Sequence, residues 1–92
     1  MQKRLECTVF GRVQFVMFRD FAQRKGTSCG VVGTVRNLPD GSVSVIAEGE
    51  EDRLQKFLAL LHRGSILSRV ERVEESWGDT TGEFTRFTIL YT

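Results

Sequence analysis

The sequence contains few of the residues on which many catalytic and metal sites depend. Its 92 residues include one histidine, one proline, one tryptophan and two cysteines. A single histidine, His62, excludes a histidine-rich metal site. Cys7 and Cys29 are too far apart in the sequence for a zinc knuckle or a redox pair, and their apolar neighbours favour free buried thiols over a disulfide. We therefore expect both thiols to be inert.

Long apolar runs and a large excess of one charge are also absent. No stretch approaches the roughly 18 apolar residues that a membrane span requires, and residues 1–6 carry charges before any apolar run develops. The 13 basic and 12 acidic residues are mixed along the chain and leave a net charge of +1. This balance gives no electrostatic reason to expect a nucleic-acid or membrane partner, so we expect a cytoplasmic protein.

The composition is typical of one small globular domain. Apolar residues make up 40% and charged residues 27% of the chain, and no repeat, low-complexity tract or linker interrupts it. A chain of this length has room for one domain with one core. We expect a single domain over residues 1–92, and nothing in the sequence indicates more than a monomer.

The first third of the chain is predicted to form a strand, a loop and a helix. Residues 4–10 alternate apolar and polar side chains, as a half-buried strand does. After a loop, Phe18, Phe21 and Ala22 would share one helical face, and Gly26 follows two basic residues as a typical helix end.

A hairpin and a second helix are predicted next. Residues 31–37 and 42–48 both alternate, and the sequence Pro39-Asp40-Gly41 between them is a turn signal. The acidic residues 50–52 suit the positive end of a helix. An apolar stripe with helical spacing follows, before Gly64 ends the helix: Leu54, Phe57, Leu58 and Leu61.

Two further strands complete the predicted fold. Val70 and Val73 lie in a strand whose odd apolar spacing indicates a β-bulge, and Phe87, Ile89 and Tyr91 alternate in the last strand. The order β-α-β-β-α-β with an extra C-terminal strand favours an α+β, ferredoxin-like sandwich. In that fold an antiparallel sheet carries two helices on one face.

The loop of residues 11–19 is the most informative segment, because it leaves a strand and enters a helix whose first turn carries Arg19. Unpaired backbone N–H groups and the helix dipole make such a junction suitable for an anion such as phosphate. Arg19 would add a guanidinium fork that binds two phosphate oxygens. From the junction alone, a surface helix arginine is the simpler interpretation.

Three motifs make the chain resemble the acylphosphatase family. The family's Gly-Arg-Val-Gln-Gly-Val-x-Phe-Arg matches residues 11–19, except that Phe15 stands where the family has glycine. The family's Gly-x-Val-Arg-Asn matches residues 33–37 and its following Asp-Gly matches residues 40–41. Its Glu-Gly before the second helix matches residues 48–49. The motifs occur in the family's order and spacing, and the resemblance covers nearly the whole chain.

The resemblance implies an enzyme that hydrolyses acyl phosphates to a carboxylate and inorganic phosphate by direct attack of water, with no metal and no cofactor. Arg19 would bind the phosphoryl group with backbone N–H groups of the loop, and Asn37 would position the water. The implied phosphate-binding residues are Gln14, Phe15, Val16, Met17, Phe18 and Arg19. Such chemistry needs no protein nucleophile, because transfer from a good leaving group depends on positioning and charge stabilisation.

Phe15 leaves a second function open. Glycine at this place suggests a positive φ or a close approach of phosphate, and phenylalanine there would cost about 1 to 2 kcal/mol of strain or reshape the loop. The alternative is therefore an acylphosphatase-like binding or regulatory domain with little turnover.

Two unrelated functions share the predicted element order. An RNA-recognition motif would carry stacking aromatic residues on its third strand, but residues 42–48 contain none. A metal chaperone would need paired cysteines near the first loop. His62 is interpreted as a surface residue, and Trp77 and Tyr91 as core or rim packing. Arg12 is interpreted as a rim charge that steers anions or as an ordinary solvated arginine.

Overall fold

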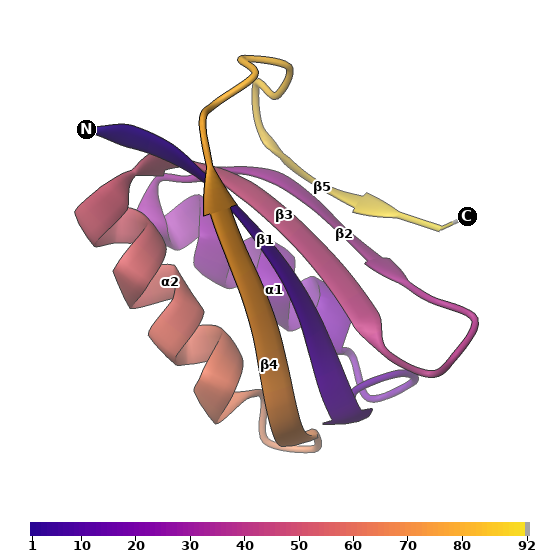
Figure 1. Cartoon of the computed structure of the whole chain (residues 1–92). Coiled ribbons are helices and arrows are strands. Elements are labelled where there is room, and N and C mark those ends of the chain that lie inside the picture. Colours follow the sequence, from indigo (N-terminus) through magenta and orange to yellow (C-terminus); the bar gives the residue numbers. More distant parts are fainter. Residues whose placement is uncertain (92) are drawn as a thin grey trace.

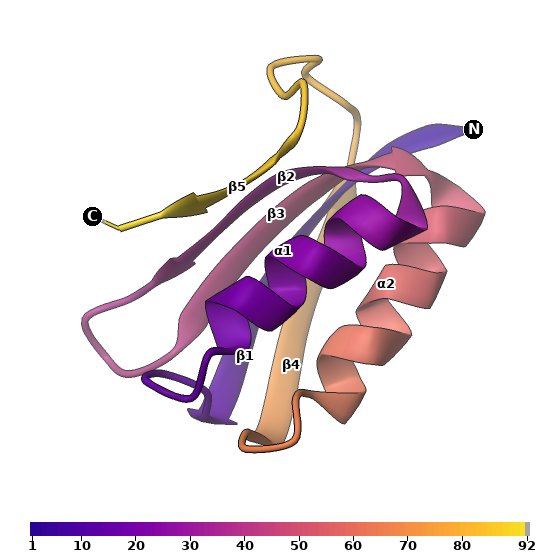
Figure 2. The same ribbon diagram turned by 180° about the vertical axis from the view of Figure 1, so that it is seen from behind.

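Seven elements follow one another in the computed structural model, which describes residues 1–91. They are β1 (Gln2–Arg12), α1 (Phe18–Cys29), β2 (Val32–Asn37), β3 (Val43–Glu50), α2 (Glu51–Arg63), β4 (Arg69–Gly78) and β5 (Phe87–Leu90). The order confirms the predicted β-α-β-β-α-β pattern with a C-terminal strand. Both helices lie on the same face of the sheet, as the two opposite views show (Figure 1 and Figure 2).

The sheet has the strand order β4-β1-β3-β2-β5 and is mixed. β1 pairs antiparallel with β3 and β4, and β2 pairs antiparallel with β3, but β5 runs parallel to β2. The prediction of an antiparallel sheet is therefore wrong for this last strand. β4 ends at the end of the sheet where β2 begins, so residues 79–86 cross that end and β5 then runs in the direction of β2 (Figure 1). Alternation of side chains along a strand carries no information about this direction.

The core lies between the sheet and the two helices. Alternate residues of β1 and β3 are buried there, and so is the whole predicted stripe of α2, which confirms the period of each element. The buried apolar residues are Leu5, Cys7, Val9, Val13, Phe18, Phe21, Ala22, Val31, Val35, Val43, Val45, Ala47, Leu54, Phe57, Leu58, Leu61 and Phe87. Burial of a side chain as large as leucine or phenylalanine contributes about 1.5 to 3 kcal/mol. None of the helices in the described residues 1–91 has the length and apolarity needed to cross a membrane.

The sequence predicted that helix α1 ends at Gly26, and this prediction is wrong. The helix continues to Cys29, and Gly30 provides the left-handed C-cap with a φ of 77°. Gly26 lies inside the helix and leaves space for the ring of Phe87, since a Cβ on Gly26 would lie 2.5 Å from Cδ2 of that ring. Phe87 also contacts the ring of Phe57 edge to face, with centroids 5.5 Å apart. The glycine thus makes room for the side chain that joins β5 to both helices.

The predicted bulge lies where β1 meets β4, next to the informative loop. Phe10 pairs with Arg72 and Gly11 pairs with Val70, so Glu71 is the additional residue on β4. Gly11 has a φ of 128°, and a Cβ there would overlap the carbonyl oxygen of Arg69. Only glycine fits this close approach of two strands, which accounts for the first residue of the loop motif.

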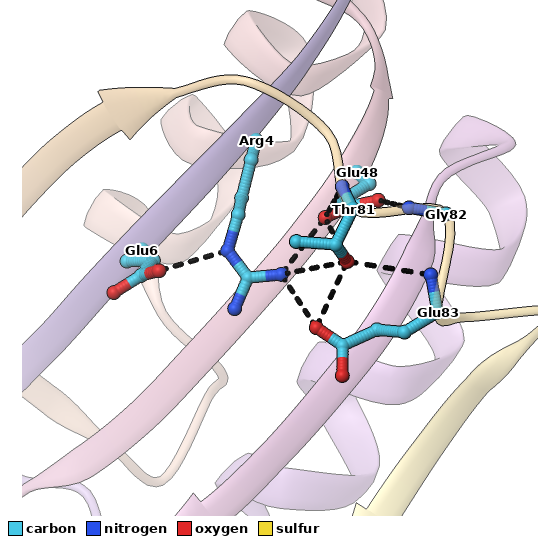
Figure 3. A network of polar contacts seen from close by, with 6 residues as sticks. All are labelled: Arg4, Glu6, Glu48, Thr81, Gly82 and Glu83. Carbon is cyan, nitrogen blue, oxygen red and sulfur yellow. Dashed lines mark hydrogen bonds and ion pairs between the residues drawn. The ribbon is translucent and has the colours of Figure 1, made fainter.

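A buried carboxylate holds the crossing segment to the sheet (Figure 3). Glu48 of β3 is 4% exposed and accepts a hydrogen bond from Arg4 Nη1 at 2.8 Å. It also accepts hydrogen bonds from the backbone N–H groups of Thr81 and Gly82, at 2.9 and 3.1 Å. Burial alone would raise the pKa of Glu48, but the hydrogen bonds from Thr81, Arg4 and Gly82 outweigh it and the pKa is lowered. The carboxylate fixes the start of the path that leads to β5.

Both cysteines are free thiols. Cys7 is buried in β1, and burial, followed by the charge of Glu75, raises the pKa of its thiol to about 12. Because the thiolate is the nucleophile, Cys7 is unreactive at neutral pH. Cys29 is half-buried at the end of α1, more exposed than the sequence predicted.

Candidate active site

The loop between β1 and α1 is held at both ends by buried side chains and exposes the residues between them. Val13 and Phe18 are each 1% exposed, whereas Phe15 is 94% and Met17 71% exposed. Phe15 has a φ of 62° and Met17 a φ of 60°, both in the left-handed region. Left-handed residues in a turn can bring backbone N–H groups to one concave side, where they attract an anion. The positive φ at residue 15 is one of the two features that the family's glycine suggests there, and the structure shows that Phe15 adopts it.

Gln14 fastens this loop to the turn between β2 and β3. Its Nε2 donates to the carbonyl oxygen of Leu38 at 2.7 Å and to that of Ser42 at 2.8 Å. Asp40 shapes the turn, because its Oδ1 accepts hydrogen bonds from the hydroxyl and the backbone N–H of Ser42, and these lower the pKa of Asp40. The tether keeps the loop beside Asn37, which ends β2.

A pocket of about 270 Å³ lies where this loop, the end of β2 and β5 meet. Its lining residues are Val13, Phe15, Met17, Phe18, Arg19, Asp20, Asn37, Ile89 and Tyr91. A larger hollow of about 430 Å³ lies between α1, α2 and the residues after α2, but neither Arg19 nor Asn37 lines it. The volume of the smaller pocket is just below the range of about 300 to 1,000 Å³ common for ligand pockets, so it suits a small ligand.

Arg19 lies in the first turn of α1 and is steadied by the C-terminal residues. Its guanidinium carbon lies 4.9 Å from the centroid of the Tyr91 ring, and its Nη1 lies 3.5 Å from the carbonyl oxygen of Leu90. Among residues 1–91, no carboxylate lies within ion-pair distance of Arg19. The neighbouring Asp20 accepts a hydrogen bond from Arg24 at 2.8 Å instead. The positive charge of Arg19 therefore remains available to an anion in the pocket.

Asn37 has a side-chain oxygen that no hydrogen-bond donor of residues 1–91 reaches. This oxygen, Oδ1, is buried. Buried polar atoms in proteins are nearly always paired, so an unpaired oxygen on a residue that lines the pocket points to a role for Asn37 beyond packing.

Comparison with known proteins decides the family. The sequence profile described as acylphosphatase matches residues 5–89. The acylphosphatase of Thermus thermophilus is 49% identical over 79 residues, which cover 86% of this chain and 90% of that protein. The acylphosphatase of Methylococcus capsulatus is 44% identical over 88 residues and 96% of both chains. The chain belongs to the acylphosphatase family. The crystal structure of acylphosphatase from Bacillus subtilis agrees, with a TM-score of 0.93 and 35% identity over 97% of this chain and 99% of that one.

The acylphosphatase motifs meet around the pocket and its supports. Residues 11–19 form the loop and the first turn of α1, residues 33–37 lead to Asn37, and residues 40–41 shape the turn that holds Gln14. Membership of this family of hydrolases decides against the RNA-binding and metal-chaperone alternatives.

Sequence reasoning gave no site role to four residues that line the pocket, Val13, Asp20, Ile89 and Tyr91. Asp20 and Ile89 carry no motif signal. Met17 was expected in the phosphate-binding loop and lines the pocket, but its left-handed conformation has no glycine to mark it. Tyr91 was expected in the core or at a rim and lies at the pocket rim, 77% exposed. His62 is exposed near the end of α2 and does not line the pocket, as expected for a surface residue.

Proposed function

We propose that this chain is a metal-independent acylphosphatase, which hydrolyses the carboxyl–phosphate bond of acyl phosphates to a carboxylate and inorganic phosphate. The observation that carries this proposal is the shared pocket, because Arg19 and Asn37 line the same small cavity. Within residues 1–91, no carboxylate pairs with Arg19 and the buried Oδ1 of Asn37 receives no hydrogen bond. Arg19 can hold an anion and Asn37 can hold a water molecule.

In the proposed mechanism, the phosphoryl group binds to the loop and to Arg19. The backbone N–H groups of residues 14–18 and the N-terminal end of α1 supply partial positive charge, and the guanidinium fork of Arg19 binds two phosphoryl oxygens. These donors would stabilise the charge that develops on the phosphoryl oxygens during transfer, which is the principal catalytic effect in this chemistry.

The attacking water would be positioned by a hydrogen bond to the side-chain amide of Asn37. The water oxygen attacks phosphorus, the bond from phosphorus to the acyl oxygen breaks, and the carboxylate leaves with the electron pair. We propose that the water proton passes to a phosphoryl oxygen of the substrate itself. The thiol of Cys7 and the imidazole of His62 have no part in these steps, because neither lines the pocket.

Phe15 favours a second candidate function, in which the chain binds acyl phosphates or phosphate with little turnover. Its φ of 62° places a residue with a Cβ where backbone strain is expected. A loop displaced by that strain would lose N–H contacts in the transition state and retain the fold. Turnover of an acyl phosphate separates the two functions.

We further propose that the chain acts as a single-domain monomer over residues 1–92, in the cytoplasm, on small acyl phosphates, and binds neither nucleic acid nor membrane. The net charge of +1 and the mixing of both signs along the chain support the part of this proposal that concerns nucleic acid and membranes, since neither surface would attract the chain electrostatically.

The test is hydrolysis of benzoyl phosphate and acetyl phosphate by the purified protein, with and without a chelator. We expect turnover of both substrates at a rate that the chelator leaves unchanged, because Arg19 and the loop supply the positive charge that a metal would otherwise supply. Activity only with added magnesium would contradict the metal-free site. Binding of phosphate without any turnover would support the second candidate.

A further inference from the structure

Exposed apolar side chains gather at the rim of the phosphate pocket. Among residues 1–91, the exposed large apolar side chains are Met1, Phe15, Met17, Ile66, Leu67 and Tyr91. Three of these, Phe15, Met17 and Tyr91, line the same small pocket as Arg19 and Asn37. They come from two segments, the loop before α1 and the residue after β5, which lie more than 70 positions apart in the sequence. Exposed apolar side chains that line a pocket together with a charged group are typical of a ligand contact.

Packing does not explain the ring of Phe15. The side chain is 94% exposed, so it adds almost nothing to the core, and its backbone occupies a conformation that glycine adopts without strain. A strained residue whose side chain stabilises nothing in the fold points to a function for that side chain. The pocket that it lines shows where the function would be exerted.

The neighbouring side chains are suited to contact with an aromatic or other apolar group. One face of the Tyr91 ring lies over the guanidinium of Arg19, with 4.9 Å between the guanidinium carbon and the ring centroid, and 77% of the residue remains exposed. Met17 contributes a polarizable thioether, which contacts aromatic rings favourably. Phe15 offers a second ring for stacked or edge-to-face contact.

We propose that Phe15, Met17 and Tyr91 form an acyl-group surface, which gives this chain a preference for acyl phosphates with a large apolar, above all aromatic, acyl group. The inference rests on the proposed function, because the phosphoryl end must lie against Arg19 and the loop for the acyl end to reach the rim. An acyl group as small as acetyl leaves the surface uncovered, whereas a benzoyl group contacts it. An aromatic contact of this kind changes affinity by about 3- to 10-fold.

The experiment measures kcat/KM for benzoyl phosphate and for acetyl phosphate in the wild-type protein and in Phe15→Ala. Alanine retains a Cβ, so the backbone strain at the positive φ of residue 15 stays similar to that of the wild type. Any effect of this strain on the loop acts on both substrates alike and cancels in the ratio of the two kcat/KM values. We expect Phe15→Ala to lower the benzoyl-to-acetyl ratio by about 3- to 10-fold and Phe15→Trp to retain or raise it. Ile66→Ala is the matched control, because Ile66 is 99% exposed and does not line this pocket, and it should leave the ratio unchanged.

The outcomes separate the acyl-group surface from the proposed function. If Phe15→Ala hydrolyses both substrates with the wild-type ratio, the acyl-group surface is wrong and the acylphosphatase activity stands. If Ile66→Ala lowers the benzoyl-to-acetyl ratio as much as Phe15→Ala does, the inference is also wrong, because the effect would not be specific to the acyl-group surface. If the wild-type protein hydrolyses neither substrate, both the activity and the surface that depends on it are wrong. A far-UV circular dichroism spectrum verifies that each variant is folded.

Discussion

Replacing Phe15 by glycine should stabilise the loop, and the comparison with Phe15→Ala isolates the backbone contribution. At a φ of 62°, a residue with a Cβ carries a penalty of about 1 to 2 kcal/mol that glycine does not. Glycine also adds freedom to the unfolded chain, which costs about 0.4 to 1 kcal/mol. Because the ring is 94% exposed, both variants lose little packing. The difference leaves Phe15→Gly more stable than Phe15→Ala by about 0.5 to 1 kcal/mol.

Urea and thermal unfolding followed by circular dichroism measure this difference. In a domain of 60 to 100 residues, 1 kcal/mol shifts Tm by about 4 to 8 °C, so Phe15→Gly should melt about 2 to 8 °C above Phe15→Ala. Met17→Gly and Met17→Ala form a matched pair at a φ of 60° and should differ in the same direction. The same relief of strain should raise kcat/KM for acetyl phosphate several-fold and tighten inhibition by inorganic phosphate.

A lower Tm for Phe15→Gly than for Phe15→Ala would refute the strain argument. Lower kcat/KM for acetyl phosphate together with weaker phosphate inhibition in Phe15→Gly would instead mean that the stiffness of residue 15 holds the loop in its active shape.

Three further predictions concern residues that support the site or lie outside it. Glu48→Gln removes the buried charge beneath the crossing segment and should lower the free energy of unfolding by about 1.5 to 3 kcal/mol at pH 7. Because the pKa of Glu48 is lowered in the folded protein, this stabilisation is present above the ordinary pKa of 4.5 and is lost as the pH falls through the folded pKa. In urea unfolding, the stability of the wild type should therefore approach that of the variant in acid. Gln14→Ala should lower kcat/KM roughly tenfold through a loosened loop, with a smaller change in Tm, because two hydrogen bonds to the neighbouring turn are lost. His62→Ala and the double change Cys7→Ser, Cys29→Ser should retain kcat, and the double variant should be less stable because Cys7→Ser places a hydroxyl in the core. A folded variant without turnover would indicate covalent catalysis.

Local patterns predicted the parts of the molecule that depend on neighbours in sequence. The stripe of α2 and the Asp40-Gly41 turn follow from periodicity and turn chemistry, and the positive φ at residue 15 is one of the two features that the family's glycine suggests there. Arg19 was assignable to the pocket only through the family motif, since its position in a first helical turn also suits a surface residue.

The missed contacts of β5 and Tyr91 depend on the path of residues 79–86 across the end of the sheet. That path places β5 parallel to β2, brings Tyr91 to Arg19 and presses Phe87 against Gly26. Contacts between segments so far apart leave no periodic signal in either segment. Gly26 was therefore interpreted by its local rule as a helix end, when its role is to admit a ring from β5.

The central claim is that Arg19 supplies the positive charge for phosphoryl transfer, and the kcat/KM of Arg19→Ala on benzoyl phosphate tests it most directly. Loss of a donor to the transition state typically costs a factor of roughly 100 to 1,000, and Arg19→Lys should recover little because an ammonium group cannot bind two oxygens as a fork. The kcat/KM of Asn37→Ala should be lower by a similar factor if Asn37 positions the water. Arg12→Ala is the matched control, because Arg12 belongs to the same motif but is exposed and does not line the pocket, and it should stay within about threefold of the wild type. A folded Arg19→Ala protein with near wild-type kcat/KM would contradict the account.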